Sequence, residues 1–145
     1  METKFNFNSQ VCASKSQSER LLALGLKKET ADCTLFRRSK NAEWEISTDS
    51  YIDWVKEILP LELGYTHEDI SPAWSLDRLR EIIPENIFTG VRNQWHRVIY
   101  NSVLTYEEGN DSLVSFRGGS IYDRFISCIY WLIKEGYFPK EYLEE

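Results

Sequence analysis

The chain has 145 residues, of which 42% are hydrophobic, 28% charged and 14% aromatic, and its formal net charge is −6. This size and composition predict a single ordered domain, residues 1–145, whose core needs no metal or disulfide to fold. The acidic balance argues against a broad nucleic-acid-binding surface, which needs clustered lysine and arginine. The sequence contains no run of 18 apolar residues, so it predicts no membrane-spanning helix.

The N-terminal part predicts a lead-in followed by a short helix. Residues 1–13 are polar and asparagine-rich at the start, so we expect a loosely ordered lead-in. Ser16 and Glu19 have the spacing of a capping box, in which each side chain satisfies a free backbone N–H at a helix start. Gly25 suits the position just past a helix end. A helix is therefore predicted between these two signals.

The next segment predicts a β-hairpin and a second helix. Residues 32–38 and 42–47 are short runs of strand character, and apolar and acidic residues alternate over 43–46 as in a half-buried strand. Apolar residues over 51–59 then fall on one helical arc, which Pro60 should end, although Tyr51 and Trp54 also suit a strand.

The stretch 60–74 contains two prolines and a glycine and predicts irregular structure, after which Ser75 caps a helix that Pro84 ends. Trp74, directly before the cap, has two interpretations. It packs on Leu79 as a hydrophobic staple, or it is an exposed aromatic anchor for a partner.

The second half predicts a three-stranded meander. Residues 95–100, 103–107 and 112–117 show the alternation of half-buried strands, and 107–111 reads EEGND, a turn signal. An antiparallel arrangement follows from the short connections.

The most apolar segment predicts a helix over 121–135. A capping-box-like start at 120–123 precedes it and Gly136 suits its end. At 100° per residue one face of this helix is apolar and should be core. The residues of that face are Tyr122, Phe125, Ile126, Ile129, Leu132 and Ile133.

Trp131 lies on the opposite side of this helix and has two interpretations. The chain's own tail covers it through Tyr137, Phe138 or Tyr142, with Arg124 stacking on the indole, or the ring is offered to a partner. In the second case Trp131, Trp74 and Tyr137 are the candidate partner-binding residues.

Candidate ligand-binding residues are few. His67, followed by two acidic residues, and His96 could serve a metal or a general base, but no HExxH or other ordered ligand spacing is present. Arg117 precedes Gly118 and Gly119 at a strand-to-helix turn that could hold an anion, without a phosphate-loop motif. We therefore predict no catalytic set, metal or cofactor.

Cys12, Cys33 and Cys128 are odd in number and widely spaced, without a CxxC or zinc-ligand pattern. The N-terminus shows no apolar signal-peptide core. Both observations favour free buried thiols in a reducing cytoplasm.

Four stretches of the chain resemble short proteins encoded on phages and other mobile elements of gut Bacteroides-type bacteria. They are CASKSQSERLLALG at 12–25, SPAWSLDRL at 71–79, VLTYE at 103–107 and WLIKEGYF at 131–138. The resemblance implies a cytoplasmic setting and an accessory role, and it carries over no catalytic or binding residue.

The sequence therefore predicts an α+β fold: one domain with an antiparallel sheet of hairpins and meander, packed against three or four helices, with the C-terminal helix central. We expect a non-enzymatic protein-interaction module that binds a protein partner or forms a homodimer. The alternatives are a small ligand-binding or hydrolytic domain using the 60–74 loop and the sheet, or an inhibitor or regulator of a nucleic-acid process.

Overall fold

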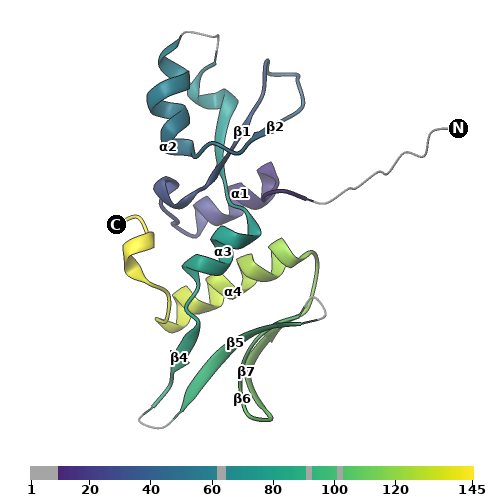
Figure 1. Ribbon diagram of the computed structural model, residues 1–145, viewed down its shortest axis with the longest axis vertical. Coiled ribbons are helices and arrows are strands. Elements are labelled where there is room, and N and C mark those ends of the chain that lie inside the picture. Colours follow the sequence, from purple (N-terminus) through teal and green to yellow (C-terminus); the bar gives the residue numbers. More distant parts are fainter. Residues whose placement is uncertain (1–9, 62–64, 91–92, 101–102) are drawn as a thin grey trace, which may run out of the picture.

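Two antiparallel sheets lie at opposite ends of the molecule, with helices between them (Figure 1). The computed structural model describes residues 10–61, 65–90, 93–100 and 103–145. Its α-helices are α1 (Lys15–Ala23), α2 (Tyr51–Asp53), α3 (Leu76–Ile82) and α4 (Ile121–Glu135). The predicted α+β fold with a central C-terminal helix is confirmed. In the described residues, no helix combines the length and apolar character needed to cross a bilayer.

Helix α1 begins two residues earlier than predicted. Its cap is Ser14, whose hydroxyl accepts from the Gln17 N–H, while the Gln17 side chain accepts from the Ser14 N–H. The expected Ser16–Glu19 box is therefore wrong, because Ser14 already satisfies the free N–H groups of this turn. Gly25 follows the helix with φ 98°, the left-handed conformation that glycine adopts without strain.

The expected loose lead-in gives way to packed structure before α1. Residues 1–9 lie outside the described part of the chain, but Cys12 and Ala13 are buried. The Ala13 N–H donates to the Trp74 carbonyl at 2.9 Å. The segment is held because it adds a backbone hydrogen bond and two small buried side chains.

The smaller sheet has the order β2-β1-β3, formed by β1 (Cys33–Phe36), β2 (Glu45–Ser47) and β3 (Ile70–Ala73). The predicted hairpin is confirmed as the β1–β2 pair. The prediction of irregular structure over 60–74 is wrong for its second half, which forms β3 against β1. Pro72 is tolerated there because β3 is an edge strand, where a missing N–H is harmless.

Residues 51–61 coil, as predicted, but in an unusual way. Helix α2 continues as a π-helix over Trp54–Ile58 and then a 3₁₀ turn over Leu59–Leu61, so Pro60 lies inside the last turn. Trp54 is buried, and its ring stacks on Phe36 of β1 with the ring centroids 4.9 Å apart. This contact ties the helix to the smaller sheet.

The larger sheet is a four-stranded meander, β4 (Asn86–Phe88), β5 (Gln94–Tyr100), β6 (Val103–Glu108) and β7 (Asp111–Phe116). The three predicted strands are confirmed and β4 is an addition at the edge. The β6–β7 turn places Gly109 at φ 60° between the paired Glu108 and Asp111, as the EEGND signal predicted.

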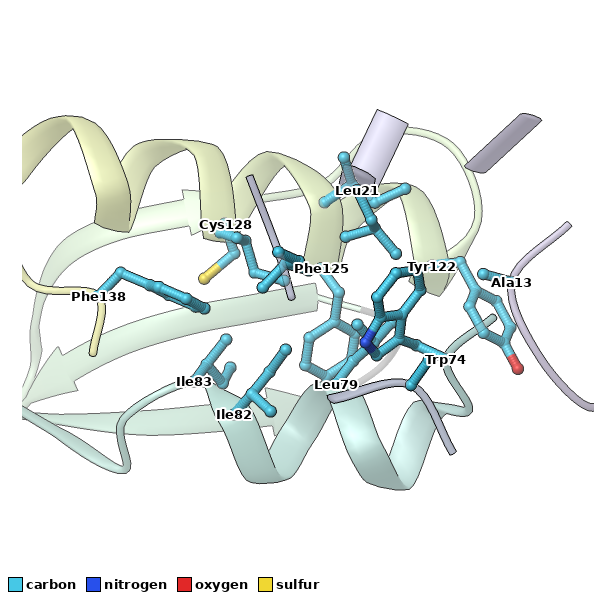
Figure 2. Packing of buried hydrophobic residues seen from close by; sticks show 14 of the residues in the cluster. Ala13, Leu21, Trp74, Leu79, Ile82, Ile83, Tyr122, Phe125, Cys128 and Phe138 are labelled. Atoms are coloured by element: carbon cyan, nitrogen blue, oxygen red, sulfur yellow. The ribbon is translucent and has the colours of Figure 1, made fainter. Parts of the chain in front are cut away.

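Helix α4 connects the two halves of the core. It contacts β6 and β7 of the larger sheet and also α1 and α3, while α1 contacts β3. Ser120 and Asp123 form its capping box, and Gly136 ends it at φ 82°. The predicted helix is thus confirmed at both ends, and Figure 2 shows its side chains interdigitating with those of α3 and the tail.

The buried face of α4 is rotated from the predicted one. Cys128 is completely buried, whereas Ile133 is only half-buried. The sheet covers one flank of the helix while α1 and α3 cover the other, so the buried arc is wider than a single-sided stripe. The buried residues of α4 are Tyr122, Phe125, Ile126, Cys128, Ile129 and Leu132.

Candidate interaction surface

Trp131 is half-buried and is held by the chain itself. Its ring centroid lies 5.8 Å from that of Tyr137 in the tail and 6.4 Å from that of Phe116 at the end of β7. The Tyr137 N–H donates to the Leu132 carbonyl at 2.8 Å, which fixes the tail next to α4. Arg124, expected to stack on the indole, donates instead to the Gly119 carbonyl.

Trp74 is completely buried, so its interpretation as an exposed aromatic anchor is wrong. Its indole N–H donates to the Thr30 hydroxyl at 2.9 Å. Trp74 precedes the Ser75 cap and Leu79 lies four residues after that cap, and both belong to the main core. This placement fits the hydrophobic-staple interpretation, and Figure 2 shows both side chains in the packed interior.

Tyr130, which the sequence reasoning did not select, is the exposed aromatic residue of α4. Its side chain is 56% exposed. On a helical wheel it lies between the apolar face and Trp131, so it was assigned to neither. The signal that could have found it is its position beside the exposed Ser127, one turn earlier on the same flank.

Two grooves run along the exposed side of α4 and meet at Ser127. The first, between α1 and α4, has a volume of 340 Å³ and is mainly apolar. It is lined by Arg20, Ala23, Leu24, Ile126, Ser127 and Tyr130. The second, of 410 Å³, lies between the end of β7 and the start of α4 and includes Phe116 and Arg124. We call Arg20, Leu24, Ser127, Tyr130 and Trp131 the α4 surface.

The charge at the start of α4 is internally compensated. The Asp123 carboxylate accepts from the Ser120 backbone N–H and hydroxyl at 3.0 Å and from Gln17 at 3.1 Å, and it pairs with Arg20 at 3.0 Å. These bonds, led by the Ser120 backbone N–H, hold the pKa of Asp123 below its usual value. Arg117 lines the groove here, but an anion bound at the helix start would meet a carboxylate that already occupies it.

The two histidines are not brought together. His67 lies in a 3₁₀ turn that leads into β3 of the smaller sheet, whereas His96 is in β5 of the larger sheet, and these sheets occupy opposite ends of the molecule (Figure 1). The His96 Nδ1 lies 2.6 Å from the Asn86 Oδ1. No group of three or more metal-ligating side chains occurs in the part of the chain that is described.

A 590 Å³ cleft between α3 and β5 gathers side chains of both signs of charge. It is lined by Asp77, Arg80, Glu81, Glu85 and Arg97. The Arg97 guanidinium donates to the Arg80 carbonyl at 2.8 Å and lies 3.7 Å from Glu85. The guanidinium N–H groups of Arg97 therefore bond to carbonyl groups at the end of α3 and have a structural role.

Comparison with known proteins gives no assignment. No protein-family model matches the chain, and neither a curated protein nor a solved structure matches it significantly. The resemblance to mobile-element proteins therefore stays a prediction.

Proposed function

We propose that this protein is a non-enzymatic interaction module that binds a protein partner through the α4 surface. The observation that carries the proposal is Tyr130, an aromatic side chain 56% exposed on a rigid helix at the edge of an apolar groove. Tyrosine contributes a large contact area with few rotatable bonds, so its burial by a partner costs little conformational entropy.

The setting of Tyr130 supports recognition rather than packing alone. Trp131 beside it is fixed by Phe116 and Tyr137, so this half of the surface is already ordered before any partner arrives. Arg20 borders the groove with half of its side chain exposed. An aromatic and apolar centre with an arginine at the rim is the composition of energetically dominant interface positions.

The same proposal includes the accessory role in a bacterial or phage cytoplasm that the resemblance implies. The ligand-binding or hydrolytic alternative has weaker support, because the groups it needs, His67 and His96, lie in separate sheets. The nucleic-acid alternative rests on the net charge alone, and that charge is modest for a chain of 145 residues.

A matched pair of variants tests the proposal. Tyr130→Arg places a charge in the centre of the α4 surface, and Phe88→Arg places one on β4, an edge strand of the larger sheet, where the side chain is 64% exposed. Sedimentation velocity of the wild type first establishes whether the partner is a second copy. Quantitative affinity capture from the native host then compares the three proteins.

We expect Tyr130→Arg to lose the dimer or the captured partner by about tenfold or more, and Phe88→Arg to keep it. Both variants should unfold within about 0.5 kcal/mol of the wild type, since neither side chain is part of the core. Equal capture by wild type and Tyr130→Arg would rule out the α4 surface as the binding site.

A further inference from the structure

Cys12 and Cys33 lie together in a small apolar cluster that is separate from the main core. The other buried members of this cluster are Leu35 and Ala73. Cys33 pairs with Ala73 across the β1–β3 ladder, and Ala13 bonds to the carbonyl of Trp74, the residue after β3. The backbone thus brings two cysteines that are 21 positions apart to the same end of the smaller sheet.

The two thiols are near enough for each to perturb the pKa of the other. Burial and the adjacent Cys33 raise the pKa of Cys12 to about 12. Burial, and after it the carboxylate of Asp32, also raise the pKa of Cys33, while the neighbouring Cys12 and Arg78 oppose that rise. Both thiols are therefore mainly protonated at neutral pH.

A groove lies beside Cys12. It has a volume of 440 Å³ and is predominantly apolar, and Cys12 forms part of its lining together with Leu35, Trp44 and Ile46. Cys128, in contrast, lies in the main core on α4 and is completely buried. Cys12 therefore lies at the wall of a groove, although its side chain is itself buried.

We propose that Cys12 and Cys33 are a dithiol site that a small-molecule disulfide, such as oxidised glutathione, converts to an intramolecular disulfide. The Cys12 thiolate attacks one sulfur of the oxidant, and a mixed disulfide forms as one small thiol leaves. The Cys33 thiolate then attacks the Cys12 sulfur and the second small thiol leaves. Two protein thiols lose two electrons and two protons, and the oxidant takes them up as two thiols.

The disulfide would tie the segment before α1 to β1. It would join the two sulfurs by a covalent bond at the wall of the groove, so the oxidation state of the cell would set how firmly this segment is held. The high thiol pKa values predict slow exchange at neutral pH that speeds up as pH rises, because only the thiolate reacts.

The test equilibrates the full chain with mixtures of reduced and oxidised glutathione, in native buffer and in concentrated urea. After acid quenching, free thiols are alkylated and disulfide-linked peptides are mapped by mass spectrometry. We expect one linkage, Cys12 to Cys33, with Cys128 alkylated, and before alkylation the oxidised protein should be lighter than the reduced protein by about 2 Da. The native structure should favour this linkage over the urea-unfolded chain by at least about tenfold in effective concentration.

Two variants separate this site from general thiol chemistry. Cys128→Ala should leave the linkage and its equilibrium unchanged, whereas Cys33→Ala should keep Cys12 as a mixed disulfide or a free thiol. The proposal is overturned if all three thiols stay free in native buffer, if Cys128 joins either partner, or if folding gives no advantage over urea.

Discussion

Leu132→Ala tests whether α4 is the central packing element. The Leu132 side chain is completely buried on the face of α4 that meets the core. The substitution removes three carbon atoms, a transfer loss of roughly 2 kcal/mol, and leaves a cavity between packed elements. The expected total is a loss of about 3 to 4 kcal/mol in the free energy of unfolding.

Urea unfolding followed by tryptophan fluorescence measures this loss. With a slope of about 2 kcal/mol per molar urea, the midpoint should fall by about 1.5 to 2 M. Ser127→Ala is the matched control, because Ser127 is exposed on the same helix and alanine favours helix formation; its effect should stay within about 0.5 kcal/mol. A Leu132→Ala loss below about 1 kcal/mol, or a larger loss at Ser127, would refute the assignment of the buried face.

Three further predictions concern local features. Gly136→Ala should lower the free energy of unfolding, measured in urea, by about 1 kcal/mol, because alanine is strained at the φ of 82° that Gly136 adopts. Steric contact does not contribute, since nothing lies within 4 Å of the added Cβ, and Gly118→Ala should leave the free energy of unfolding nearly unchanged. Asp123 has a lowered pKa, so its stabilising contribution is present above its unfolded pKa of about 3.9 and is lost as pH falls through the folded pKa. The stability difference between wild type and Asp123→Asn should accordingly shrink below about pH 4 in acid titrations of unfolding, and a constant difference would contradict it. Trp74→Phe removes the donor to the Thr30 hydroxyl and should cost about 1 to 3 kcal/mol, and a neutral effect would show that this bond contributes nothing.

Local signals in the sequence were sufficient for the elements that carry their own start and stop residues. Helix α4 is bounded by Ser120 and Gly136, and both act in the structure as the sequence predicts. The β6–β7 turn is similar, because a glycine at positive φ is read directly from the sequence.

Elements that depend on contacts with distant parts of the chain were predicted less well. Strand β3 was missed because Pro72 argues against a strand, and only its edge position next to β1 makes proline acceptable. The sequence predicts a loose lead-in at Cys12 and Ala13 because the residues that contact them follow more than 20 positions later. Both misses have the same cause, namely a long-range contact that overrides local preference.

In the α4 surface, too, local sequence signals were sufficient for some residues, while others depend on long-range contacts. Trp131 was correctly placed on the side of α4 opposite its main apolar arc, but which residues cover it depends on the end of β7 and on the tail. Tyr130 was missed because helical projection gives an angle and not the neighbour that covers it. The thiol pair had no sequence signal at all, since its members are 21 positions apart and meet only through the β1–β3 pairing and the Ala13–Trp74 backbone bond.

Oxidative footprinting of the aromatic side chains tests the central claim most directly. Brief hydroxyl-radical labelling of the free protein, and of the wild-type dimer or captured complex, gives a labelling rate for each residue. The α4 surface predicts that Tyr130 is labelled readily in the free protein and is protected several-fold in the complex, while Phe88 is labelled equally in both. Protection at Phe88 with an unchanged rate at Tyr130 would contradict the account.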